Sequence, residues 1–158
     1  MRVGATGHRM LPPGTARLVE EALRRRLAPE AGPSLVGISL LADGADQLFA
    51  DMVLALGGSL EVVVPATHYR EALPADCRQA YDRQLAQATT VERLDHRELT
   101  TEALMAAGRR VVERSELLLA IWDGRPARGM GGTGDVVEYA KRTGVPVEVV
   151  WPSGASRS

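Results

Sequence analysis

The sequence contains few of the features that mark secreted or membrane proteins. Its one cysteine, Cys77, has no partner for an intramolecular disulfide, which fits a reducing compartment. No apolar run approaches the roughly 20 residues that a membrane-spanning helix requires, and the first residues lack the apolar region of a signal peptide. Aromatic residues make up only 4% of the chain, so aliphatic side chains must form the core. We therefore expect a cytoplasmic protein that does not cross a membrane.

An excess of charge of either sign is also missing. The chain has 19 basic and 20 acidic residues and a formal net charge of −1. Such a chain lacks the broad cationic field that attracts nucleic acids non-specifically. We therefore expect no bulk nucleic-acid partner and a small ligand instead.

The signatures of common metal and hydrolase sites are absent as well. His8, His68 and His96 are not spaced as zinc ligands with one another or with Cys77, and neither H-E-x-x-H nor C-x-x-C occurs. A G-x-S-x-G nucleophile elbow is also missing. The sequence therefore predicts no bound metal and no cofactor, and it argues against a zinc enzyme or a serine hydrolase.

Strand-like and helix-like segments alternate along the whole chain. This alternation predicts an α/β fold, a Rossmann-like three-layer sandwich with a mostly parallel central sheet and helices on both faces. We expect a single domain over residues 1–152, followed by a flexible C-terminal tail over 153–158. The expected strands cover residues 2–5, 35–41, 60–64, 90–94, 117–122 and 145–151. The expected helices follow residues 12–14, cover 45–56, cover 68–88 with a break at Pro74, follow a cap at Thr100 or Thr101, and cover 133–143.

Small, polar and basic residues gather where the predicted strands end. In an open parallel sheet, ligands bind outside the carboxyl ends of the strands, where loops diverge and helix N-termini present free N–H groups. The loops after the first, second and fifth strands would share this edge of the sheet. The candidate ligand-binding residues there are Thr6, Gly7, His8, Arg9, Gly44, Asp46, Asp123, Gly131, Gly132, Thr133, Gly134 and Asp135.

The glycine-rich run after the fifth strand predicts phosphate binding. Residues 131–134 can bring several backbone amides close to an anion, because glycine has no side chain and tolerates positive φ. The helix that follows adds the partial positive charge of its N-terminus, and Thr133 adds a hydroxyl donor. A loop that merely turns the chain is the alternative, but the position between a buried strand and a helix favours phosphate binding.

The first two loops carry groups that suit the rest of such a ligand. The chain is expected to turn tightly at residues 6–7, where His8 and Arg9 can donate to a phosphate or a ribose. Alternatively, His8 packs against the turn and Arg9 is a surface residue. Of Asp43 and Asp46, at least one is expected to cap the second helix, and the other can accept hydrogen bonds from a ribose or a base.

Three segments carry a resemblance to a known group of proteins. They are residues 4–9 (Gly-Ala-Thr-Gly-His-Arg), residues 42–50 (Ala-Asp-Gly-Ala-Asp-Gln-Leu-Phe-Ala) and residues 121–137 with their glycine-rich run. Together they resemble the SLOG superfamily, which includes the DprA-type and LOG-type Rossmann-like domains. The resemblance covers nearly the whole chain and implies a nucleotide-binding domain. It also implies a homodimer, because related LOG-type proteins are commonly dimers.

The LOG-type members imply a specific reaction. These phosphoribohydrolases cleave the N-glycosidic bond of cytokinin nucleoside monophosphates and carry a P-G-G-x-G-T-x-x-E motif. Residues 131–138 match its glycines and its final glutamate, with methionine before them in place of proline and aspartate in place of threonine. The resemblance implies Glu138 as a catalytic residue, stabilising a ribosyl cation or positioning water, and Arg109 or Arg110 as the upstream arginine. The R-K-x-x-M pattern around that arginine is missing, and a solvated helix face is the alternative for Glu138.

Three functions follow from these patterns. The first is the binding of a nucleotide or nucleotide-derived phosphorylated ligand, in the manner of a sensor. The second is a LOG-like phosphoribohydrolase that cleaves nucleoside 5′-monophosphates. The third is a structural or partner-binding domain without a ligand.

Overall fold

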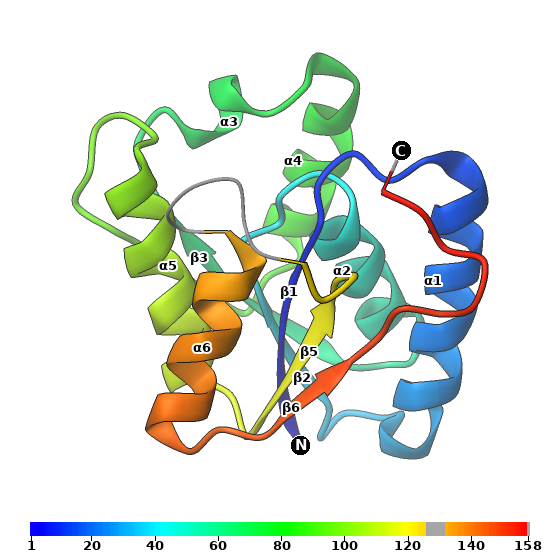
Figure 1. The fold of residues 1–158 in the computed structure, drawn as a ribbon. Helices are drawn as coiled ribbons and strands as arrows, with labels where there is room; N and C mark the ends of the chain where they lie inside the picture. Colours follow the sequence, from blue (N-terminus) through cyan, green and yellow to red (C-terminus); the bar gives the residue numbers. More distant parts are fainter. Residues whose placement is uncertain (126–131, 158) are drawn as a thin grey trace.

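The computed structural model describes residues 1–125 and 132–157, and the six strands in those ranges form one sheet (Figure 1). The strand order is β4-β3-β2-β1-β5-β6, and each neighbouring pair is parallel. The predicted Rossmann-like α/β fold is thereby confirmed. The strands are β1 (Arg2–Gly7), β2 (Val36–Ser39), β3 (Ser59–Val64), β4 (Thr90–Arg93), β5 (Leu117–Ile121) and β6 (Val147–Val149).

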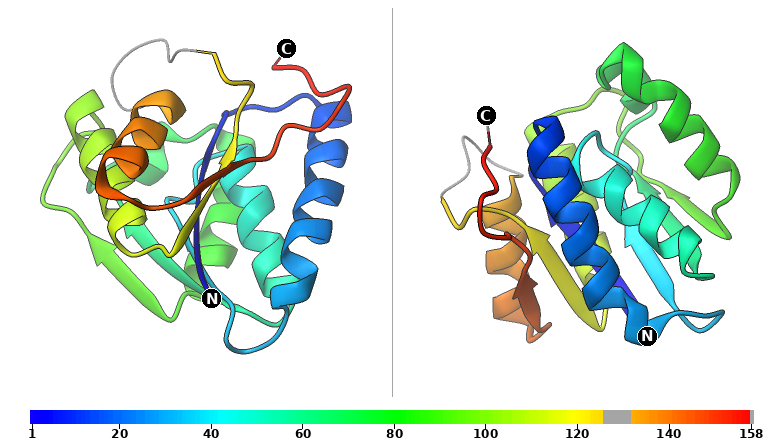
Figure 2. Two further views of the ribbon diagram at one scale, coloured as in Figure 1. Left: turned by 60° about the horizontal axis from the view of Figure 1, so that its bottom comes forward. Right: turned by 90° about the vertical axis from the view of Figure 1, so that its right-hand side faces the viewer.

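Helices cover both faces of the sheet and complete the three layers (Figure 2). One face packs against α1, α2 and α4, and the other packs against α5 and α6. The predicted break at Pro74 is confirmed, since a short helix ends before it and a longer one follows. The helices are α1 (Pro13–Leu27), α2 (Ala45–Ala55), α3 (Tyr69–Ala72), α4 (Arg78–Ala86), α5 (Thr101–Glu113) and α6 (Thr133–Thr143), with short 3-10 turns η1 (Ala28–Glu30) and η2 (Ala75–Cys77).

Strand β3 shows how one segment contributes to both cores. Leu60, Val62 and Val64 pack with the helices on the α1 and α2 face, whereas Val63 packs with those on the α5 face. Successive side chains of a strand point to opposite faces, so an apolar run of this length is buried on both sides. Each such side chain contributes roughly 1.5–3 kcal/mol to folding.

Two helix ends follow the signals in the sequence. The Thr100 hydroxyl accepts a hydrogen bond from the Ala103 N–H (3.0 Å), so Thr100 and not Thr101 caps α5. At the end of α6, Gly144 adopts the left-handed conformation (φ +81°). Its position just past the helix is the usual one for glycine, and it confirms the predicted end of α6.

Several strand boundaries differ from the predicted ones. The turn expected at residues 6–7 is wrong, because Thr6 and Gly7 continue β1 and pair with Ala120 and Ile121 of β5. Strand β6 is shorter than the predicted 145–151, since its ladder with β5 covers only three residues. Strand β2 ends at Ser39 and not at Leu41, where the backbone turns into positive φ (+57°).

The end of the chain folds back onto the start of α1. The Thr15 hydroxyl donates to the Ser156 carbonyl (2.8 Å) and accepts from the Ser156 N–H (2.9 Å). Arg157 Nε lies 3.6 Å from Asp123 Oδ2. The segment predicted to be a flexible tail therefore makes polar contacts with the domain, and its mobility stays a prediction.

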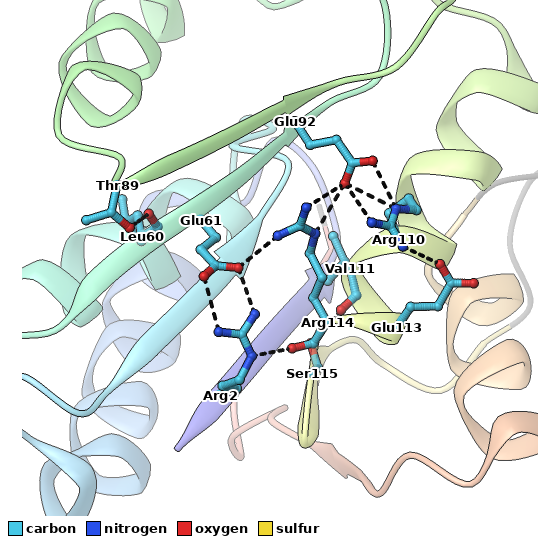
Figure 3. Close-up of polar contacts among 10 residues, drawn as sticks. All are labelled: Arg2, Leu60, Glu61, Thr89, Glu92, Arg110, Val111, Glu113, Arg114 and Ser115. Atoms are coloured by element: carbon cyan, nitrogen blue, oxygen red, sulfur yellow. Dashed lines mark hydrogen bonds and ion pairs between the residues drawn. The ribbon is translucent and has the colours of Figure 1, made fainter.

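An ion network ties the end of α5 to the sheet (Figure 3). Arg2 donates to both carboxylate oxygens of Glu61 (3.1 and 2.7 Å), and Arg114 joins Glu61 (3.0 Å) to Glu92 (2.9 Å). Arg110 also donates to Glu92 through Nε, at 3.1 Å from each oxygen. These contacts lie on the α5 face of the sheet, and none of them involves a candidate ligand-binding residue.

Candidate functional site

The strand order reverses between β1 and β5, and this reversal defines the candidate site. Strand β1 is followed across one side of the sheet by β2, β3 and β4, and it pairs on its other side with β5. At such a switch point the two following loops diverge and leave room for a ligand. We call the carboxyl ends of β1, β2, β3 and β5, with the residues that follow them, the rim.

His8 and Asp123 meet directly at the switch point. The His8 N–H donates to the Ile121 carbonyl (3.0 Å), which continues the β1–β5 ladder by one step. The Asp123 backbone N–H donates to His8 Nε2 (3.1 Å), and Asp123 Oδ1 lies 3.2 Å from the same nitrogen. Asp123 therefore contacts the imidazole through both its backbone N–H and its carboxylate.

The surroundings of His8 favour its neutral form. Its side chain is buried, with the Trp151 ring packed edge-on at 5.3 Å between centroids. Burial lowers the pKa of His8 below its ordinary value, and the positive charge of Arg157 acts in the same direction, while Asp123 opposes them. His8 therefore packs against the protein, as the alternative expectation has it, and its contact with a ligand stays a prediction.

Asp123 is the point at which the start and the end of the chain meet. Its Oδ1 accepts a hydrogen bond from the Arg125 N–H (3.0 Å), and its Oδ2 faces Arg157. Burial acts to raise the pKa of Asp123, but the Arg125 N–H, His8 and Arg157 together lower it. Sequence reasoning missed Arg157, because a lone arginine in a terminal segment carries no pattern.

Arg9 forms an ion pair with Asp43 across the first two loops. Its Nε and Nη2 both lie 2.7 Å from Asp43 Oδ1. The arginine side chain is 45% exposed, whereas the Asp43 side chain is 1% exposed. Arg9 is therefore not an unpaired surface residue, because the buried Asp43 carboxylate occupies its Nε and Nη2. An anion at the rim would have to share the guanidinium with Asp43.

Close backbone approach joins the same two loops. Gly44 has φ +84°, and a Cβ on it would lie 2.8 Å from both the His8 carbonyl oxygen and the Met10 nitrogen. The Ala45 N–H at the start of α2 donates to that His8 carbonyl (3.1 Å). The expected capping of α2 by Asp43 or Asp46 is therefore wrong: Gly44 is the N-cap and no side chain caps the helix.

Asp46 lies under this junction beside Tyr69, the first residue of α3. Asp46 Oδ2 accepts a long hydrogen bond from the Ala42 N–H (3.3 Å). Burial raises the pKa of Asp46 to about 7, and the Asp43 charge adds to the effect against the Ala42 N–H and Arg9. Burial, followed by the charge of Asp46, holds the pKa of the Tyr69 hydroxyl well above its usual range. A perturbed carboxyl at the strand ends is typical of a functional site.

We call Asp43, Asp46 and Tyr69 the cluster under Arg9. Three oxygens in this cluster have no hydrogen-bond partner among the residues that the structure describes. They are Asp43 Oδ2, Asp46 Oδ1 and the Tyr69 hydroxyl. Unpartnered buried polar atoms are rare, and each costs about 1–3 kcal/mol of stability. The first two loops also hold two non-glycine residues at positive φ, Met10 (+54°) and Leu41 (+57°). Such strain, like the unpartnered oxygens, gathers at functional sites.

The N-terminus of α6 supplies the other side of the rim. Gly132 is its N-cap, and Thr133 is buried in the first turn. The N–H groups of Thr133 and Gly134 begin the helix, which offers them no acceptor of its own. The Asp135 N–H donates to the Gly132 carbonyl (3.1 Å). Gly131 lies outside the described residues, so its part in an anion cradle stays a prediction.

The two residues that the LOG resemblance implies as catalytic lie on different helices. Glu138 is an exposed residue of α6, more than a turn from its first residue. Arg109 is an exposed residue of α5 whose guanidinium lies over the Tyr139 ring (5.4 Å). The structure places neither side chain in contact with His8, Arg9 or Asp123. Their catalytic roles stay predictions.

Metal-binding clusters and membrane-spanning helices are both missing from residues 1–125 and 132–157. In those ranges no group of three or more His, Cys, Asp or Glu residues is arranged to hold a metal ion. Within the same part of the chain, none of the helices combines the length and the apolar character needed to cross a bilayer.

The switch point and the polar side chains above it make this chain a Rossmann-like α/β domain with a polar rim. Solved structures of DNA processing protein A (DprA) have the same fold. The Streptococcus pneumoniae protein matches with a TM-score of 0.71 and 18% identity, over 94% of this chain and 49% of that one. The Helicobacter pylori protein, described for its single-stranded DNA binding mode, matches with a TM-score of 0.69 and 17% identity, over 99% of this chain and 68% of that one.

A molybdenum cofactor binding protein from the phototrophic bacterium Rippkaea orientalis also has this fold. It matches with a TM-score of 0.60 and 15% identity, over 94% of this chain and 74% of that one. The predicted resemblance to DprA-type domains is therefore confirmed at the level of the fold. This chain spans about half the length of the S. pneumoniae protein. No protein-family model matches the sequence, and no curated protein matches it.

Proposed function

We propose that this chain binds a nucleotide or a nucleotide-derived phosphorylated ligand at the rim, with a phosphate between Arg9 and the N-terminus of α6. The observation that carries the proposal is the pairing of β1 with β5 at the switch point, which places the loops after both strands side by side. One of these loops carries His8 and Arg9, and the other leads into α6.

The charges and dipoles at this position suit an anion. The N-terminus of α6 carries a partial positive charge and N–H groups that have no acceptor inside the helix, which together favour phosphate. The guanidinium of Arg9 is close to half exposed, and the edge that Asp43 does not occupy, Nη1 and the second N–H of Nη2, can donate to a phosphate. His8 packs beside Arg9 at the end of β1, and its imidazole ring can donate to the ligand or accept from it.

Proteins of the same fold bind ligands of related kinds. H. pylori DprA binds single-stranded DNA, whose backbone is a chain of phosphates, and the R. orientalis protein binds the molybdenum cofactor. The formal net charge of −1 favours a small ligand over a polynucleotide for this chain. A short single-stranded oligonucleotide nevertheless belongs in the test.

The test is calorimetric titration with purine and pyrimidine nucleoside mono-, di- and triphosphates and with a short single-stranded DNA. We expect at least one nucleotide to bind, and Arg9→Gln to weaken that binding about tenfold or more, because it removes a charge-assisted pair. Arg17→Gln on the exposed face of α1 removes the same charge away from the rim, and it should leave the affinity unchanged.

A second variant tests the α6 side of the rim. Gly132→Trp places a large side chain at the N-cap of α6, so it should block an anion there. The proposal fails if no nucleotide binds the native protein, or if both variants bind as the native protein does. If only the oligonucleotide binds, the ligand of this chain is a polynucleotide and not a small nucleotide.

A further inference from the structure

The cluster under Arg9 contains one more negative charge than the protein balances when both of its carboxylates are ionised. Asp43 pairs with the guanidinium of Arg9, and Asp46 interacts electrostatically with both groups. Tyr69 of α3 interacts electrostatically with Asp46, Arg9 and Asp43, and its hydroxyl is neutral. Two buried carboxylates with a single cation nearby favour uptake of one proton, because a like charge and a low dielectric both disfavour the second ionised form.

The unpartnered oxygens show where that proton has room. Asp43 Oδ2 and Asp46 Oδ1 are both buried and have no hydrogen-bond partner among the described residues. Asp43 uses its other oxygen for Arg9, and Asp46 uses its other oxygen for the Ala42 N–H. A proton on Asp46 Oδ1 would convert this unpartnered hydrogen-bond acceptor into a donor.

Arg9 is the residue that both the cluster and an incoming anion require. In the structure its Nε and Nη2 are directed to Asp43 Oδ1. When Asp43 and Asp46 are both ionised, the two carboxylates attract the Arg9 guanidinium into the cluster. The same two negative charges repel a phosphate at the rim. With Asp46 protonated, only one of those charges remains.

We propose that Asp46 is a positioning residue for Arg9: it takes up a proton from solvent when an anion binds at the rim, and the loss of its charge weakens both the attraction of the guanidinium to the two carboxyl groups and the repulsion of the anion. The inference rests on the function proposed above and adds its regulation, since anion affinity should rise as the pH falls through neutrality. The carboxylate of Asp46 and the solvent proton give the neutral carboxylic acid, and no other bond changes.

Other groups near the cluster have to be separated from Asp46. Cys77 of η2 is electrostatically coupled to Asp43 and Arg9, Tyr81 of α4 is coupled to Tyr69, and burial raises the pKa of each. Both are neutral below neutral pH. His8 is the other group that gains charge on acidification, but its pKa is lowered, so its effect falls at more acidic pH than that of Asp46.

The first experiment needs no nucleotide. Sulfate keeps the same charge between about pH 5.5 and 8.5, so its affinity, measured by NMR titration at constant ionic strength, reports only on the protein. We expect the native protein to bind sulfate about tenfold more tightly at the acidic end than at the basic end of that range. Infrared difference spectra of the ligand-free protein should show a protonated carboxyl group that titrates near neutral pH.

Asp46→Asn is the decisive variant because asparagine resembles the protonated acid. Its oxygen still accepts from the Ala42 N–H, and its amide can donate where the acid would. We expect it to bind sulfate tightly at all these pH values and to lack the infrared carboxyl signal. Glu20→Gln, on an exposed face of α1, makes the same charge change and should retain the native pH profile.

The outcomes separate this inference from the proposed function. If sulfate or a nucleotide binds but the pH profile of Asp46→Asn equals that of the native protein, or the carboxyl signal is absent, the coupling is wrong and the binding function stands. If neither sulfate nor any nucleotide binds at any of these pH values, the binding function and the coupling fail together.

Discussion

Gly44 shows how one backbone position holds two loops of the rim together. Its positive φ and the lack of a side chain allow the loop after β2 to lie against the backbone of His8 and Met10. The same approach lets the Ala45 N–H reach the His8 carbonyl. The position of Arg9 above Asp43 depends on this contact, so Gly44 links a conformational requirement to the chemistry of the site.

Gly44→Ala should therefore destabilise the protein. The added Cβ meets backbone atoms at 2.8 Å, and an L-residue at this φ is strained, so we expect a loss of about 1–3 kcal/mol in the free energy of unfolding. Chemical denaturation followed by circular dichroism measures it. Gly14→Ala in α1 is the control, because a Cβ added there would meet nothing within 4 Å, and the variant should be neutral or slightly stabilised. Equal stability of the two variants would contradict the close approach.

At the scale of elements, the ion network adds polar contacts between the end of α5 and the sheet to the apolar packing of that helix. Glu61 is the central acceptor, with Arg2 and Arg114 both donating to it. The Arg2 hydrogen bonds, the Arg2 charge and Arg114 lower the pKa of Glu61 against the effect of burial. A carboxyl whose folded pKa is lowered stabilises the protein above its unfolded pKa, and this contribution is lost as the pH falls through the folded value.

Glu61→Gln should lower the free energy of unfolding at neutral pH by about 1–2 kcal/mol, since it leaves two partly buried guanidinium groups without their common carboxylate. The variant should also lose less stability than the native protein as the pH falls below the ordinary glutamate pKa of 4.5. Urea denaturation over that pH range measures both effects. Glu20→Gln is the control for a solvent-exposed pair on a helix. A native-like acid profile in Glu61→Gln would contradict the role of the network.

The elements themselves were predictable where a local signal marks both their ends. Helix α6 begins at Thr133 and ends at Thr143 as predicted, because Gly144 adopts the left-handed conformation there. Strand β6 was predicted too long, because apolar residues continue beyond the part that pairs with β5. A strand ends where its partner ends, and the partner is not visible in a local pattern.

At the scale of the whole molecule, residues far apart in the chain meet at the rim. His8 contacts Asp123, the Trp151 ring packs on His8, and Arg157 faces Asp123. The gathering of loops from β1, β2 and β5 was predictable from parallel topology alone. The pairing of Arg9 with Asp43 and the contact of Arg157 with Asp123 could not be predicted, because they depend on strand order and on the path of the last residues.

Arg157→Gln should raise the pKa of His8. The Arg157 charge adds to burial in keeping the imidazole neutral, so its removal lets protonation occur at higher pH. A ¹H–¹⁵N NMR titration of the histidine side chains measures the change, with Arg17→Gln as a control of equal charge. An unchanged or lower pKa in Arg157→Gln would mean that the end of the chain does not influence the site.

The ion network and the rim are made of different residues. The contacts that anchor α5 gather around Arg2 and Arg114, while the loops beyond Gly7 and Ile121 belong to the rim. The loops that determine ligand specificity can therefore change while the contacts that attach α5 to the sheet are kept. We expect this domain to tolerate transplanted loops at its ligand edge, which would make it a practical scaffold for recognition of new anions.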